Sequence, residues 1–180
     1  MGHGIAAAAV MGRLSATVRA LARLDMPPTA LLHQLEATLA DLAEPMLATF
    51  LYVVCDPATG HCTITRAGHP PPAVAEPDGT VYLVKTPPGA PLGVGGVTFT
   101  TTDITLPKGS LLVLYTDGLI EARNRDIDER LSELTGLLTE PLQPLDHLCD
   151  SLIAHLVPAS ADDDIALLTA RIGTNHPAGP

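Results

Sequence analysis

The chain has 180 residues, of which 46% are hydrophobic, and its 20 acidic and 10 basic residues give a formal net charge of −10. This length suffices for one domain with its own core, and no apolar run reaches the roughly 18 residues that a membrane-spanning helix needs. The N-terminus has no signal-peptide pattern. An acidic balance argues against nucleic-acid binding, which requires a basic surface. Because residues 103–180 carry −8 of the net charge, composition favours a cation site in the C-terminal half.

Two amphipathic helices are predicted at the start of the chain. Residues 5–24 have helical spacing, and Pro27-Pro28 ends this segment before a second helix over residues 29–42. The apolar face of the first is predicted to carry Val10, Met11, Leu14, Val18 and Leu21, opposite Arg13, Arg19 and Arg23. The stripe of the second is Leu31, Leu35, Leu39 and Leu42.

A run of strands is predicted next, at residues 49–55, 61–66, 73–75, 81–84, 97–106 and 110–116. Turn signals join neighbouring strands into hairpins, at Asp56-Pro57 with Gly60 and at Asp78-Gly79. Helices follow at 127–138 and 145–156, and the last strand is predicted at 164–172. This order predicts an α+β domain of mostly antiparallel sheets with segregated helices, over residues 1–172, followed by a disordered tail at 173–180.

Two carboxylates stand at the ends of predicted strands. Asp117 follows the apolar run that ends at Tyr115 and precedes Gly118, while Asp163 lies in a run of three aspartates before the last strand. Asp-Gly is also an ordinary turn dipeptide, and an acidic run is commonly just solvated loop. Brought together, however, the two carboxylates would repel unless a divalent cation with oxygen ligands compensated them. The residues alone therefore indicate a divalent-metal site on an α+β domain.

Other candidates are weaker. Gly2-His3-Gly4 before an alanine-rich helix is either a phosphate-cradling turn or a remnant without function, and His69 is interpreted as a loop histidine beside a proline run rather than a proton carrier. Asp126, Asp128 and Glu129 are predicted to complement the dipole of the following helix. The odd set of Cys55, Cys62 and Cys149 indicates a reducing compartment without a disulfide framework. Cys55 and Cys62 flank a turn and could face each other, but we favour small buried apolar residues.

Taken together, five segments resemble the metal-dependent serine/threonine phosphatases of the protein phosphatase 2C superfamily, in particular the bacterial branch typified by the sporulation stage II protein E phosphatase domain. The segments are residues 1–7, 48–60, 67–71, 115–122 and 162–168. The resemblance implies an αββα sandwich of mostly antiparallel sheets flanked by helix pairs, with a binuclear Mn²⁺ or Mg²⁺ centre. There the metals would activate a water that attacks phosphoserine or phosphothreonine.

The resemblance also assigns residues. Asp117 matches the metal-binding aspartate of the family's Thr-Asp-Gly motif, and Asp163 matches the metal ligand of its final Asp-Asp motif. Glu121 falls in the same segment as Asp117 without an assigned role. Residues expected to support the site without being assigned as metal ligands are Asp164, Gly118, Gly2, His3 and Gly4.

One departure from the family pattern concerns the N-terminus. The family reads Gly-Asp-Val-x-Gly-His-Gly, with an aspartate that bridges both metals, and this sequence begins at the x, as Met1. The bridging ligand and the family's first strands are therefore not among residues 1–180. We expect a start codon assigned at an internal methionine; a genuine truncation and a piece of a larger polypeptide are the alternatives. Residues 1–180 are expected to hold at most one metal ion weakly, with little activity.

By resemblance, the substrate would be a phosphorylated anti-sigma-factor antagonist in the bacterial cytoplasm, with a sensor domain upstream in a longer chain. The two N-terminal helices occupy the place of the family's regulatory switch helices. The alternative function is a non-catalytic module that binds the phosphoprotein or a regulator.

Overall fold

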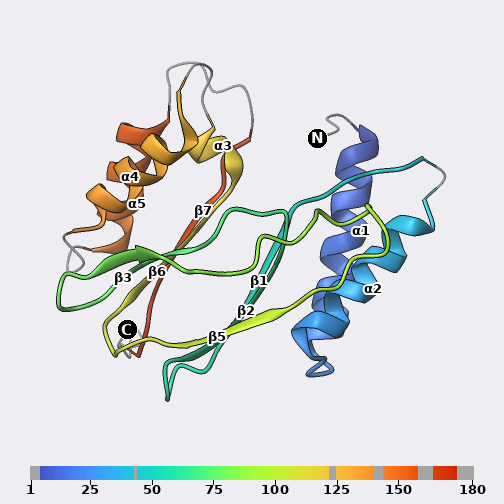
Figure 1. Cartoon of the computed structure of the whole chain (residues 1–180), viewed down its shortest axis with the longest axis horizontal. Helices are drawn as coiled ribbons and strands as arrows, with labels where there is room; N and C mark the ends of the chain where they lie inside the picture. Colours follow the sequence, from blue (N-terminus) through green and yellow to red (C-terminus); the bar gives the residue numbers. More distant parts are fainter. Residues whose placement is uncertain (1–4, 43, 122–124, 140–143, 158–163, 174–180) are drawn as a thin grey trace, which may run out of the picture. The chain divides into compact units, whose positions relative to one another are not determined.

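The computed structural model describes residues 5–42, 44–121, 125–139, 144–157 and 164–173 (Figure 1). The chain forms two compact units. Unit 1 comprises Met1–Val54, Thr63–His69 and Thr86–Ile104, and unit 2 comprises Cys55–Cys62, Pro70–Lys85 and Thr105–Pro180.

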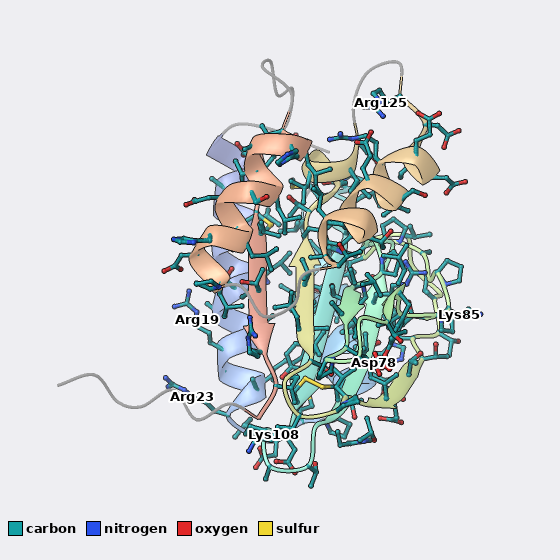
Figure 2. The ribbon with its side chains drawn as sticks, turned by 90° about the vertical axis from the view of Figure 1, so that its left-hand side faces the viewer. Arg19, Arg23, Asp78, Lys85, Lys108 and Arg125 are labelled. Atoms are coloured by element: carbon teal, nitrogen blue, oxygen red, sulfur yellow. A yellow bond between two sulfur atoms is a disulfide. The ribbon has the colours of Figure 1, made fainter. Side chains whose placement is uncertain are left out.

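In unit 1, helices α1 (Ile5–Ala22) and α2 (Pro28–Ala40) pack against each other and share a core with residues of the neighbouring strands and loops. That core contains Leu14, Leu31, Leu32, Leu35, Leu39, Ala67, Leu92 and Phe99. The predicted apolar stripes are confirmed except at Met11, which is 57% exposed. Arg19 and Arg23 point away from α1 (Figure 2), in agreement with the predicted polar face.

A three-stranded sheet has the order β1-β2-β5, with β1 at Phe50–Cys55, β2 at His61–Ala67 and β5 at Thr101–Thr105. β1 and β2 form the predicted hairpin, in which the Asp56 N–H donates to the His61 carbonyl over 2.8 Å. Gly60, at φ 72°, lets the turn approach the backbone of Leu106, since a Cβ there would lie 2.2 Å from that carbonyl oxygen. β5 is shorter than the predicted strand over residues 97–106.

The prediction that Cys55 and Cys62 are unpaired is wrong. Their sulfurs form a disulfide with a Cα–Cα distance of 4.1 Å, drawn as a yellow bond in Figure 2. The hairpin explains it: the Asp56–His61 hydrogen bond makes Cys55 and Cys62 the next directly opposed pair, at the close separation of a non-hydrogen-bonded position. Cysteine usage therefore no longer indicates a reducing compartment. Cys149 is free.

In unit 2, a four-stranded antiparallel sheet has the order β4-β3-β6-β7. Its strands are β3 (Ala73–Ala75), β4 (Val81–Leu83), β6 (Leu111–Tyr115) and β7 (Leu167–Arg171). Helices α4 (Ile127–Leu137) and α5 (Leu145–Leu156) cover one face, seen beside the sheet in Figure 1. The shared core includes Ala73, Ala75, Leu111, Val113, Tyr115, Leu134, Leu148, Leu152 and Leu156.

Two details of unit 2 differ from the sequence-based prediction. A short helix α3 (Asp117–Ile120) follows β6, where the sequence-based prediction has no helix. β7 begins at Leu167 rather than residue 164, because the Ala166 N–H donates to the hydroxyl of Thr116 instead of entering the strand ladder.

Asp126 caps α4 by accepting from the Asp128 N–H over 2.7 Å, which confirms that these acids begin a helix. None of the described helices could cross a bilayer.

Candidate metal centre

Asp117 stands at the end of a rigid strand. β6 is buried along almost its whole length, and its last residue, Tyr115, donates its hydroxyl to the Pro71 carbonyl over 2.8 Å. Thr116 then adopts an extended conformation as the N-cap of α3, and Asp117 begins that helix half-buried. The sheet therefore holds the backbone before Asp117 in a fixed position, while its carboxylate lies near the surface.

Thr116 joins this corner to the segment before β7. Its N–H donates to the Ala166 carbonyl over 3.0 Å, its hydroxyl accepts from the Ala166 N–H over 2.9 Å, and the same hydroxyl donates to the Asp164 carbonyl over 3.3 Å. Gly118 is buried beside the same carbonyl, because a Cβ on it would lie only 2.8 Å from the Asp164 oxygen. The backbone of Asp164 thus lies directly against the Thr116–Gly118 turn.

Of the two predicted metal ligands, Asp117 lies among the described residues. The Asp117 carboxylate accepts from the Gly118 N–H over 3.1 Å through Oδ1, and carboxylate oxygens are the ligands that Mg²⁺ and Mn²⁺ prefer. Within the described part of the chain, no group of three or more histidine, cysteine, aspartate or glutamate side chains is close enough to hold a metal ion. The carboxylate chemistry of Asp117 suits a hard divalent cation, and the other predicted ligand, Asp163, lies outside the described residues.

Four predicted site residues lie outside the described residues: Asp163, Gly2, His3 and Gly4. Convergence of Asp117 and Asp163 to within about 10 Å, as a shared ion requires, stays a prediction. The neighbouring Asp164 is described, and its side chain is exposed while its carbonyl meets Thr116. Glu121 contributes its N–H to the Asp117 carbonyl over 2.7 Å, which closes α3.

His69 lies on a loop of unit 1 whose backbone carbonyls accept hydrogen bonds from Arg66. The Arg66 guanidinium donates to the carbonyl of His69 over 2.6 Å and to those of Pro87 and Thr86 over 3.1 and 2.9 Å. Arg66 therefore organises this loop through carbonyl groups. The predicted loop position of His69 is confirmed, while its interpretation as a residue other than a proton carrier stays a prediction.

Sequence reasoning missed Thr116. Its hydroxyl is both donor and acceptor between the two acidic segments, so it joins them more directly than any residue singled out from the sequence. The available signal was its position, since a threonine before Asp-Gly is a favourable helix N-cap. In the structure the side chain bonds to the segment before β7 rather than capping α3.

Comparison with solved structures supports this architecture. The RsbU and RsbW domains of Rv1364c from Mycobacterium tuberculosis superpose with a TM-score of 0.86 at 28% identity, over 96% of this chain and 50% of that chain. The PP2C phosphatase domain of Bacillus subtilis SpoIIE, with a fragment of its regulatory domain, gives 0.77 at 17% identity over 96% and 52%. RsbX in complex with magnesium gives 0.73 at 17% over 96% and 77%. The expected α+β class, with antiparallel sheets and helix pairs, is confirmed as that of PP2C-type phosphatases.

Sequence comparison identifies the family. Protein IcfG of Synechocystis sp. (strain ATCC 27184 / PCC 6803 / Kazusa) is 29% identical over 128 residues, which are 68% of this chain and 20% of IcfG. The chain thus spans about a fifth of IcfG and half of the Rv1364c chain. The family model described as Stage II sporulation protein E (SpoIIE) matches residues 1–173. Since that match covers nearly the whole chain, this protein belongs to the SpoIIE family.

Proposed function

We propose that this domain is a metal-dependent phosphoprotein phosphatase that hydrolyses phosphoserine or phosphothreonine on a regulatory protein. The observation that carries the proposal is the corner at Thr116, Asp117 and Gly118. It presents a carboxylate at the end of a buried strand and contacts the backbone of Asp164. Family membership supports the same function, because relatives of known structure include a PP2C phosphatase domain of SpoIIE.

In this proposal Asp117 and Asp163 hold Mn²⁺ or Mg²⁺. Such an ion, when bound, lowers the pKa of a coordinated water and neutralises charge that develops on the phosphoryl group. The chain's own part is to fix the ligands: β6 and the hydrogen bonds of Thr116 hold the backbone immediately before Asp117. RsbX is described in complex with magnesium and SpoIIE after soaking in manganese, so either ion is compatible with the fold.

The proposed substrate is a phosphorylated anti-sigma-factor antagonist in the cytoplasm, with a sensor domain upstream in a longer chain. One relative joins RsbU and RsbW domains in a single protein, and another is described as part of the bacterial stressosome. Both associations support a regulatory protein as partner.

We assign the regulatory role to α1 and α2, whose contact includes the buried Leu14. Leu14→Ala should loosen α1 and raise the Mn²⁺ concentration required for half-maximal turnover. An unchanged Mn²⁺ requirement in the folded variant would remove this role.

Calorimetric Mn²⁺ titration tests the metal site directly. Asp117→Asn is expected to abolish most of the binding heat, and Asp150→Asn is the matched control, since Asp150 is an exposed aspartate on α5 of the same unit. Equal heats for the unsubstituted chain and Asp117→Asn would exclude Asp117 as a ligand.

Turnover of a phosphoserine protein, measured with Mn²⁺ in parallel, separates the two candidate functions. The second candidate is a module that binds the phosphoprotein without hydrolysis; within the described residues, no group of three or more potential ligands is present. Phosphoprotein binding by residues 1–180 without turnover would favour this module, and the same residues are expected to have little activity. Metal binding with turnover that is lost in Asp117→Asn would establish the phosphatase.

A further inference from the structure

Arg130 is a buried cation in unit 2. It is 4% exposed and lies on α4 four residues before Leu134, on the face of the helix that packs into the core. A charged side chain on such a face is costly unless hydrogen-bond acceptors surround it. The sequence signal for this buried cation is therefore an arginine at an apolar position of an amphipathic helix.

The acceptors of Arg130 come from three helices. Nη2 donates to the carbonyls of Leu119 over 3.0 Å and of Leu156, and Nη1 donates to Glu133 Oε2 over 2.8 Å. Leu119 lies in the last turn of α3 and Leu156 is the last residue of α5, and carbonyls at helix C-termini have no partner within their own helix. One guanidinium on α4 thus satisfies the ends of both neighbouring helices.

The contact with Leu119 bears on the metal centre. α3 has only four residues, and a helix of one turn has no stability of its own. Its N-terminal side is held by the bonds of Thr116 to Ala166 and Asp164, and its C-terminal side by Arg130. Asp117 lies between these two attachments, two residues before Leu119.

We propose that Arg130 is a positioning residue for metal binding at Asp117. The proposal rests on the proposed function, because it concerns the same ligand. Arg130 acts through the backbone of α3: it holds the short helix against α4 and α5, so that the carboxylate of Asp117 keeps the orientation that a metal ion requires.

The direction of the effect distinguishes positioning from simple electrostatics. A positive charge beside a cation site repels the incoming ion, so removal of the Arg130 charge would by electrostatics alone tighten Mn²⁺ binding. Loss of positioning instead weakens binding. Partners that orient metal ligands change affinity by about 10- to 100-fold on removal. We expect about tenfold weaker Mn²⁺ binding for Arg130→Met, because Arg130 holds the backbone rather than the ligand itself.

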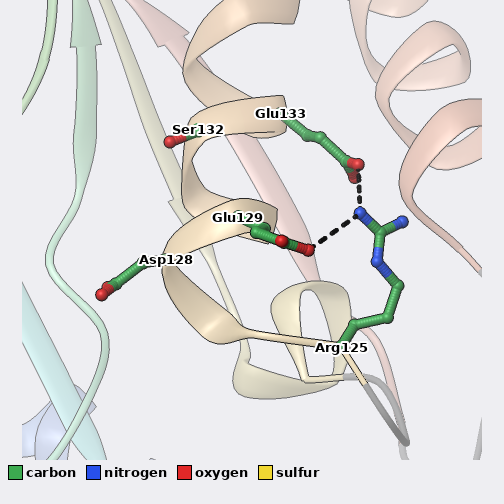
Figure 3. A pocket seen from close by; sticks show the side chains of 5 residues that line it. All are labelled: Arg125, Asp128, Glu129, Ser132 and Glu133. Atoms are coloured by element: carbon green, nitrogen blue, oxygen red, sulfur yellow. Dashed lines mark hydrogen bonds and ion pairs between the residues drawn. The ribbon is translucent and has the colours of Figure 1, made fainter.

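Arg125 provides the matched control. Figure 3 shows it beside α4, where it forms ion pairs with Glu133 over 2.5 Å and Glu129 over 3.7 Å. Its side chain is 42% exposed. The hydrogen bond to Glu133 is the main cause that raises the pKa of Arg125 above its usual value. Arg125→Met removes the same charge from the segment just before α4 without touching the carbonyl of Leu119, so its Mn²⁺ affinity should stay unchanged.

The experiment compares the unsubstituted chain with Arg130→Met, Arg130→Lys and Arg125→Met. Mn²⁺ affinity is measured by calorimetry at a temperature where circular dichroism shows each variant folded. Hydrogen exchange of the amides of residues 118–121 is measured without metal. Arg130→Met should bind Mn²⁺ about tenfold more weakly and exchange faster at these amides, while the amides of β6 stay protected. Arg130→Lys should be intermediate, because an ammonium group cannot reproduce the planar fork that reaches the two carbonyls through Nη2 and Glu133 through Nη1.

Each failure has its own signature. If folded Arg130→Met binds Mn²⁺ as tightly as the unsubstituted chain, or more tightly, the positioning role is overturned. If Arg130→Met does not fold, Arg130→Lys decides in the same way, since it keeps the charge and most of the stem. If the unsubstituted chain neither binds Mn²⁺ nor hydrolyses a phosphoprotein, the proposed function fails. In that case unchanged exchange at residues 118–121 in the variant would separately refute the attachment of α3 by Arg130.

Discussion

Replacement of Gly118 by alanine tests the packing of the turn at Thr116, Asp117 and Gly118 against Asp164. A Cβ at this position would lie 2.8 Å from the Asp164 carbonyl oxygen, 3.3 Å from Ile165 Cγ1 and 3.4 Å from the Asp164 carbonyl carbon. The first contact is far too short, and the obstructing atom belongs to backbone, which cannot rotate away. Relief requires a shift of roughly half an ångström between α3 and the segment before β7, which is the scale on which overpacking becomes destabilising.

The cost can be estimated from two contributions. Overpacking of a buried site typically costs 1–3 kcal/mol. The shift also lengthens the 3.3 Å bond from the Thr116 hydroxyl to the Asp164 carbonyl, whose loss costs about 1 kcal/mol. The higher helix propensity of alanine returns at most about 1 kcal/mol. We therefore expect Gly118→Ala to lower the free energy of unfolding by about 2 kcal/mol, equivalent to a fall in Tm of about 4–8 °C for a chain of this size.

Gly136→Ala is the control, because Gly136 lies in α4 of the same unit and a Cβ there meets nothing within 4 Å. It should be neutral or stabilising by about 0.5 kcal/mol, through reduced freedom of the unfolded chain. Urea unfolding followed by far-ultraviolet circular dichroism measures both variants. Mn²⁺ titration of folded Gly118→Ala should also show weaker binding. Equal stabilities of the two variants would refute the close approach of Gly118 to Asp164, and with it the geometry of the corner.

Three further predictions concern other parts of the chain. Glu36→Ala should lower the free energy of unfolding by about 2 kcal/mol, because the Glu36 carboxylate accepts hydrogen bonds from the N–H groups of Gly93 and Gly95 over 2.7 Å each. Gln34→Ala on the same helix should change the stability little, and equal effects of the two substitutions would contradict a stabilising role of Glu36. Burial, and then a hydrogen bond to a neighbouring carboxylate, raises the pKa of Tyr82 from 10.0 to about 12. The difference in ultraviolet titration between the unsubstituted chain and Tyr82→Phe should therefore have its midpoint near pH 12. The stabilisation that Tyr82 contributes is complete below pH 10 and is lost between pH 10 and 12. A midpoint near pH 10 would show that the phenol is exposed. Reduction of the disulfide between Cys55 and Cys62 should cost about 2 kcal/mol. Thiol titration in denaturant should rise from one reactive thiol, Cys149, to three on reduction, and three thiols before reduction would show that the disulfide is absent.

Local patterns in the sequence determined the order and type of nearly all elements. Helical spacing of leucines located α2, α4 and α5, and Asp-Gly with flanking β-branched residues located the hairpin of β3 and β4. These predictions succeeded because amphipathic periodicity and turn chemistry act between residues that are close in the chain. The same reasoning selected Asp117 as a carboxylate held at the end of a buried strand.

Tertiary structure alone decided two features, the pairing of Cys55 and the contacts that support the carboxylate of Asp117. The disulfide of Cys55 depends on hairpin register, which a one-residue shift would have changed. The attachments of Thr116 to Asp164 and of Arg130 to Leu119 end on backbone carbonyls. Every residue other than proline offers the same carbonyl and N–H, so a hydrogen bond to backbone leaves no trace in the identity of its acceptor. The sequence could therefore indicate Asp117 as a candidate ligand, whereas the contacts that hold this side chain in place exist only once the chain has folded.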